Sequence, residues 1–88
     1  MFTSQSYVGM ETPDANTFNK HCGCAFITGS NGTSKNYPID YLRSYLLYYN
    51  LNDTYKFQLF VNCDVGDLNR FYIRVCYGSG GWSTWREL

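Results

Sequence analysis

The sequence lacks most features that would assign it to a functional class at first sight. It has two prolines, one histidine, and seven basic against seven acidic residues, so its formal net charge is zero. Nucleic-acid binding and adsorption to anionic membranes both need a positive field, so neither kind of partner is expected. No apolar run approaches the roughly 20 residues of a membrane-spanning helix, and residues 1–6 lack the order of a signal peptide.

A catalytic constellation is missing as well. The single histidine, His21, directly precedes Cys22, and adjacent residues of a strand point to opposite faces. A Cys–His dyad from this pair is therefore geometrically poor, although His21 with Cys24, Cys63 or Cys76 stays open. The sequence predicts no enzyme and no cofactor.

The four cysteines are spaced unlike a common metal site. One residue separates Cys22 from Cys24 and twelve separate Cys63 from Cys76, so neither pair forms the short knuckle of structural zinc sites. Without a signal for secretion, we interpret them as reduced thiols that pack as small apolar side chains. Disulfide bonds, and a zinc site of His21, Cys22, Cys24 and either Cys63 or Cys76, remain as alternatives.

What the chain has in abundance is aromatic side chains. Nine Tyr, six Phe and two Trp stand among 88 residues. Aromatic and β-branched residues suit a half-buried pleated surface, and this length is enough for one small domain. A domain of this size is marginally stable by itself, so we expect self-association to contribute to its stability.

The hydrophobic pattern predicts an antiparallel β-meander with at most one short helical turn near the N-terminus. Residues 14–19 follow Pro13 and can form that turn, with Asp14 or Thr12 as the N-cap. Residues 40–49 fit a helical stripe and also a strand, and their four tyrosines favour the strand. Short turns join the predicted strands, and the fold class is mainly β. The strands are predicted at residues 21–28, 40–49, 55–62, 71–77 and 82–88.

The last segment of the chain carries a specific pattern. Tyr72-Ile73-Arg74 is followed by a glycine-rich turn and by Trp82-Ser83-Thr84-Trp85-Arg86. This order resembles the closing strands of the pyocin-knob domain of phage tail fibres and related particles. Weaker similarities follow the family's order through residues 14–18, 23–27, 37–39 and 55–60. The sequence departs from the family's pattern at His21-Cys22 and in the tyrosine-rich residues 41–49.

The resemblance implies a small β domain at or near the end of a trimeric fibre, used in assembly or in attachment to the host surface. Under it, residues 1–13 are an extended lead-in from an upstream fibre shaft, and residues 14–88 form the knob-like domain. The expected partners are further copies of the chain in a homotrimer, other virion proteins, and a bacterial surface glycan or protein. The implied location is the virion, after synthesis in the cytoplasm of the bacterial host.

Four residues of the closing segment are the candidate binding residues: Arg74, Tyr77, Trp82 and Trp85. A sugar ring packs its apolar face on an aromatic ring while its hydroxyl groups bond to polar side chains. Packing in the core or between subunits is the alternative role for the same rings. The loops at residues 29–35 and 62–69 are expected to face the host surface. A purely structural trimerisation or capping module without a receptor site is the main alternative function, ahead of a small zinc-binding module.

Overall fold

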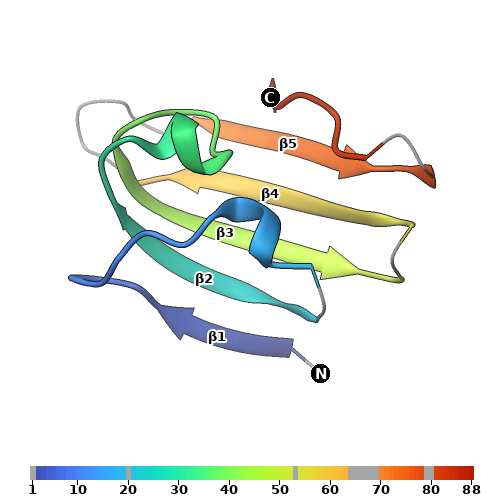
Figure 1. The fold of residues 1–88 in the computed structure, drawn as a ribbon, viewed down its shortest axis with the longest axis horizontal. Helices are drawn as coiled ribbons and strands as arrows, with labels where there is room; N and C mark the ends of the chain where they lie inside the picture. Colours follow the sequence, from blue (N-terminus) through green and yellow to red (C-terminus); the bar gives the residue numbers. More distant parts are fainter. Residues whose placement is uncertain (1, 20, 53, 64–69, 79–80) are drawn as a thin grey trace.

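The chain folds into one six-stranded β-sheet with two short 3-10 helices on one face (Figure 1). The computed structural model describes residues 2–19, 21–52, 54–63, 70–78 and 81–88. The strands follow the order of the chain, β1-β2-β3-β4-β5-β6. They are β1 (Phe2–Ser6), β2 (Cys22–Gly29), β3 (Leu42–Asn50), β4 (Lys56–Asn62), β5 (Phe71–Cys76) and β6 (Arg86–Glu87).

Strands β2 to β6 form the antiparallel meander that the sequence predicts. The prediction of a mainly β fold is confirmed, and so is the strand in the tyrosine-rich stretch, because β3 pairs along its length with both neighbours. The last strand is shorter than predicted: β6 is confined to Arg86–Glu87, and Trp82 forms only an isolated bridge with Cys76.

Strand β1 adds a parallel edge to the meander. Phe2 pairs with Cys22 and Ser6 with Phe26, so part of the predicted lead-in lies in the same sheet as the predicted domain. The division of the chain at residue 13 stays a prediction. Within the described residues, no helix is long and apolar enough to cross a membrane.

One face of the sheet carries the core, and we call it the covered face. Alternate residues of β2, β3 and β4 point to it, so Ile27, Leu46 and Phe60 are fully buried. Ala15 and Phe18, in and after the first 3-10 helix, pack on these side chains. The covered face also buries polar groups, namely Ser44, Gln58, Asn62 and Arg74.

The two 3-10 helices lie in front of the sheet in Figure 1, on the covered face. The first, η1 (Ala15–Thr17), has Asp14 as its N-cap, with the Asp14 carboxylate accepting from the Asn16 amide at 2.8 Å. This confirms the predicted helical turn and its cap. The second, η2 (Gly32–Lys35), follows Asn31, which has left-handed backbone geometry. It is part of the predicted loop at residues 29–35, and Gly32 within it is buried.

The opposite face, which we call the bare face, has no second layer in the described part of the chain. Its side chains are mostly apolar, yet many are widely exposed; Tyr49 is 49% exposed and Val75 46%. Neighbouring rings contact one another, as Phe26 and Tyr45 do at 4.9 Å between centroids. The apolar residues of the bare face on β2 to β5 are Cys24, Phe26, Tyr45, Leu47, Tyr49, Phe57, Leu59, Val61, Phe71, Ile73 and Val75.

Candidate functional site

Arg74, Trp82 and Trp85 come together on the covered face, as the sequence suggested for a binding site. Arg74 lies on β5, and its guanidinium carbon is 4.2 Å from the centroid of the Trp82 ring and 4.8 Å from that of Trp85. Both distances are within the range of cation–π attraction. The two rings therefore hold the guanidinium between them, and Arg74 is only 5% exposed.

Hydrogen bonds fix the same guanidinium between the covered face of the sheet and η1. Its Nε donates to Gln58 Oε1 at 2.8 Å, and one terminal nitrogen donates to Asn16 Oδ1 at 2.8 Å. Gln58 in turn donates to the Ala15 carbonyl oxygen at 2.7 Å. This network connects β5, β4 and η1, so Arg74 also anchors the short helix to the sheet.

Burial changes the acid–base properties of the site. Desolvation lowers the pKa of Arg74 to about 10, and the nearby carboxylate of Asp14 opposes that shift. Arg74 is therefore still protonated at neutral pH. The pKa of Tyr37 is raised, first by burial and then by the charge of Asp14, so its phenol stays neutral. The Tyr37 hydroxyl donates to the Pro13 carbonyl oxygen at 2.8 Å.

The two tryptophans are held in place by the segment between them. Ser83 pairs with β5, because its amide donates to the Val75 carbonyl oxygen at 2.8 Å and its hydroxyl accepts from the Val75 amide at 3.0 Å. The Trp85 indole donates to the Asn36 carbonyl oxygen at 2.8 Å, and its ring lies edge-on to Phe60. Trp85 is therefore a packing residue of the core edge, whereas Trp82 lies further out.

An open pocket of about 440 Å³ lies beside these rings, and we call it the Arg74 pocket. Neutral hydrogen-bonding groups and the Arg74 guanidinium line it, and aromatic side chains form part of its wall. Such a mixture suits a polar ligand, such as a sugar, better than an apolar molecule. The pocket is lined by Asn16, Thr33, Asn36, Tyr37, Pro38, Arg74, Trp82, Ser83, Thr84 and Trp85.

The sequence did not predict Asn16 or Asn36 as residues of the Arg74 pocket, although both line it. Asn36 is placed by its left-handed backbone and by its side-chain amide, which donates to both carboxylate oxygens of Asp14 at 2.9 and 3.0 Å. Asn adopts left-handed backbone geometry more readily than most residues. An Asn directly after the predicted loop was therefore the one signal in the sequence for this lining residue. The approach of a segment 22 residues away depends on the tertiary fold.

Tyr77, the fourth candidate residue, lies apart from the other three. Its ring is 73% exposed and meets Tyr55 edge-on at 5.6 Å between centroids. Both rings line an apolar groove of about 440 Å³ at one end of the bare face, together with Tyr49, Phe57 and Val75. Tyr77 belongs with the exposed aromatic surface and does not line the Arg74 pocket.

The alternative zinc site is not assembled in this fold. Cys22 and Cys24 are half-buried on the bare face, while Cys76 is buried on the covered face and Cys63 is exposed. All four cysteines are free thiols. Among the described residues, no three His, Cys, Asp or Glu side chains gather closely enough to hold a metal ion. The loop predicted at residues 62–69 is described only at Asn62 and Cys63.

Comparisons of this chain with protein-family models, curated proteins and solved structures returned no significant match. The resemblance to the pyocin-knob family therefore rests on the quoted residues alone.

Proposed function

We propose that this chain is a homotrimeric attachment domain of a phage fibre or tail appendage. The observation that carries the proposal is the bare face, because an apolar face of this size calls for a partner surface. Further copies of the chain supply that surface in a homotrimer, and the Arg74 pocket then serves a glycan or protein of the bacterial surface. The location on a virion and the contact with other virion proteins come from the sequence resemblance.

The area of the bare face supports a copy of the chain as its partner. Six aromatic residues on it or at its end are between 39% and 73% exposed. At about 150–250 Å² for each ring, they leave about 600 Å² of aromatic surface in water. Half-buried neighbours such as Leu47, Leu59 and Ile73 raise this toward about 800 Å², which is what each partner of a stable complex buries. A typical monomer has no apolar patch larger than about 300–600 Å². The six aromatic residues are Tyr45, Tyr49, Tyr55, Phe57, Phe71 and Tyr77.

The charges on the bare face fit the same partner. Among the described strand residues, Arg43 and Arg86 are the charged side chains that point to it, one near each margin, and no acidic side chain does. The centre therefore offers a partner apolar contact and no ion pairs. A surface of the same composition, as on another copy, matches it without burying an unpaired charge.

The first test is the mass of the 88-residue chain in solution. Light scattering is expected to give a mass near three chains, and the double variant Phe57→Glu, Val75→Glu is expected to be a folded monomer. Met10 is 61% exposed and lies outside the sheet, so Met10→Glu is a matched control that should keep the trimer. A monomer at every concentration tested would contradict the trimer.

The second test concerns the receptor. Binding to bacterial surface glycans on an array is expected for the unmodified chain and is expected to be lost in Trp82→Ala, with the fold checked by circular dichroism. Tyr77→Ala distinguishes the Arg74 pocket from the bare face. This variant should keep glycan binding, because Tyr77 lies outside the Arg74 pocket. If the intact trimer gives no signal on the array, the proposal that its receptor is a glycan is contradicted.

The structural alternative keeps one specific observation in its favour. Arg74 already occupies one face of Trp82 and of Trp85, which is how packing rings behave. A trimerisation or capping module with no receptor site predicts that Trp82→Ala disrupts assembly and that no loop variant changes attachment. Mass and attachment measured on the same variants separate this function from the proposed one.

A further inference from the structure

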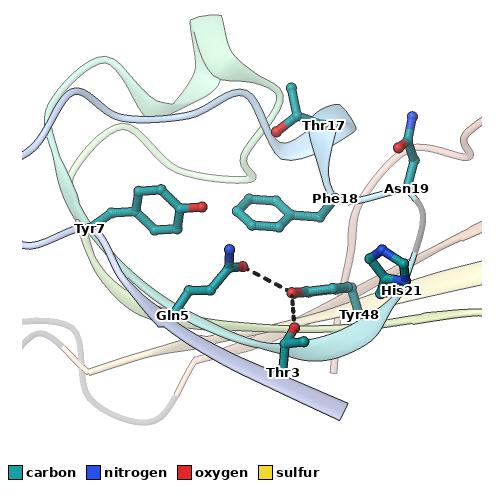
Figure 2. A pocket seen from close by; sticks show the side chains of 8 residues that line it. All are labelled: Thr3, Gln5, Tyr7, Thr17, Phe18, Asn19, His21 and Tyr48. Atoms are coloured by element: carbon teal, nitrogen blue, oxygen red, sulfur yellow. Dashed lines mark hydrogen bonds between the residues drawn. The ribbon is translucent and has the colours of Figure 1, made fainter. Parts of the chain in front are cut away.

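A second pocket lies at the β1 edge of the covered face, and we call it the Tyr48 pocket (Figure 2). Its volume is about 330 Å³, and it shares no lining residue with the Arg74 pocket. Side chains from three parts of the fold converge on it: Thr3, Gln5 and Tyr7 from β1 and its end, Phe18 after η1, and Tyr48 from β3.

The floor of the Tyr48 pocket is a directed chain of hydrogen bonds. The Tyr48 hydroxyl donates to Gln5 Oε1 at 3.0 Å. Since this hydroxyl has a single proton, the 3.0 Å contact with Thr3 Oγ1 has Thr3 as its donor. Gln5 accepts through its oxygen, and so its amide nitrogen keeps its hydrogens for another acceptor. Figure 2 shows that nitrogen directed toward the space between the Tyr7 and Phe18 rings.

Aromatic rings form the apolar part of the Tyr48 pocket. Phe18 is 7% exposed, and its ring is 5.0 Å from that of Tyr48 and 5.9 Å from that of Tyr7. The Tyr7 ring stands almost perpendicular to Phe18, at 83°. These contacts hold the rings in fixed orientations, so the pocket exists without a ligand to order it.

Polar side chains complete the rim. Thr17, Asn19 and His21 also line the pocket, and Figure 2 shows Asn19 and His21 on the same side of it. None of the described lining residues is an Asp, Glu, Lys or Arg. The rim therefore selects against strongly charged ligands, because no opposite charge would compensate their desolvation.

We propose that the Tyr48 pocket binds one neutral pyranose ring, such as a single hexose unit of a glycan. A pyranose offers an apolar C–H face to the half-buried Tyr7 ring, and hydroxyl groups that accept from the Gln5 amide and bond to Asn19 and His21. The volume is at the low end for small-molecule sites, which suits a single ring. This site goes beyond the proposed attachment function, since it requires neither the trimer nor the Arg74 pocket.

The site is tested by NMR titration of the ¹⁵N-labelled chain with the methyl glycosides of glucose, galactose and mannose and with N-acetylglucosamine. At least one of these sugars is expected to shift the Gln5 side-chain amide and the His21 ring signals while leaving the Trp82 indole signal in place. Gln5→Ala is expected to weaken binding about three- to tenfold, as the loss of one neutral hydrogen bond does.

Variants at the rim keep the test independent of folding. The His21 side chain is exposed, so His21→Ala is expected to weaken binding in a fully folded chain. Ser4 lies on β1 but points to the bare face, so Ser4→Ala is the matched control and should bind as the unmodified chain does. The absence of shifts with all four sugars would overturn the proposal. Shifts confined to the Trp82 indole would also overturn it, but would support the Arg74 pocket as the glycan site.

Discussion

Arg74 shows how a charged residue is accommodated in a small core. Two hydrogen bonds and two aromatic rings contact its guanidinium and offset part of the cost of burying the charge. Its neighbour Gln58 is fully buried and has both ends of its amide occupied. The hydrogen bonds of the Arg74 guanidinium and of Gln58 thus link β5, β4 and η1 on the covered face.

Replacing Arg74 tests this role in stability. Arg74→Met keeps much of the side-chain volume but leaves Gln58 Oε1 and Asn16 Oδ1 without their donor. The expected loss in the free energy of unfolding is about 1.5–3 kcal/mol, the range for hydrogen bonds to a charged group. Urea denaturation measures it. Arg86 is exposed on β6, so Arg86→Met should cost under about 0.5 kcal/mol; equal losses in both variants would contradict the role of Arg74.

Asp40 contributes to stability in a pH-dependent way. Its carboxylate accepts from the Thr33 hydroxyl and from the Thr33 amide, and these bonds lower its pKa below the ordinary 3.8. A carboxyl whose pKa is lowered in the folded state stabilises the fold above its ordinary pKa, and this contribution is lost as the pH falls through the lowered value. Melting temperatures of the unmodified chain should therefore fall more steeply below about pH 4 than those of Asp40→Asn. Parallel curves for the two proteins would show that Asp40 has no such role.

At the scale of elements, the position of β1 depends on one glycine of β2. Gly23 pairs with Thr3, and a Cβ at Gly23 would collide with the Thr3 carbonyl oxygen and lie 2.7 Å from the Tyr48 hydroxyl. The absence of a side chain therefore lets β1 approach the sheet and lets Thr3 reach Tyr48. The pairing of β1 with β2 and the floor of the Tyr48 pocket therefore both need a residue without a side chain at position 23.

Gly23→Ala is expected to loosen β1 while β3 to β5 stay paired. The crowding should cost about 1–3 kcal/mol, as overpacking does in other proteins. Hydrogen–deuterium exchange should become faster for the β1 amides and remain slow in β4. Ser6→Ala is the control, because Ser6 is exposed on the bare face of the same strand. Unchanged exchange in β1 after Gly23→Ala would show that the strand tolerates the added methyl group.

At the scale of the whole molecule, the two faces differ in an unexpected way. The covered face buries Ser44, Gln58 and Arg74, whereas the bare face leaves Phe57 and Val75 in water. In a single copy of the chain, no other described segment covers this apolar surface. If further copies of the chain cover this face, as proposed above, the stability of the domain depends on association.

Thermal unfolding should reveal that dependence. If association covers the bare face, the melting temperature rises with protein concentration, because the equilibrium between associated and unfolded chains follows mass action. Differential scanning calorimetry over a wide concentration range measures this. The variant Phe57→Glu, Val75→Glu should melt at one temperature throughout, and a constant melting temperature for the unmodified chain would contradict association.

Local patterns in the sequence predicted the meander strands, the helical turn with Asp14 or Thr12 as its N-cap, and four candidate residues of which Arg74, Trp82 and Trp85 come together. Alternation and turn residues act over a few positions, so β3, β4 and β5 and the turn at η1 can be inferred without a fold. The closing segment places Arg74 and Trp82 on facing parts of one hairpin, which is also local.

Only the tertiary structure decided which face of the sheet is covered. Phe57, Leu59 and Val61 alternate with Gln58 and Phe60, and the period of two says that the two sets face apart but not which one η1 and η2 will cover. That choice depends on contacts between distant segments, such as Gln58 with Ala15 and Trp85 with Asn36. Other long-range contacts place β1, because it pairs with β2 and its Thr3 and Gln5 bond to Tyr48 in the floor of the Tyr48 pocket. Local patterns in the sequence cannot predict these contacts, because each one joins segments that are far apart in the chain and meet only when the chain folds.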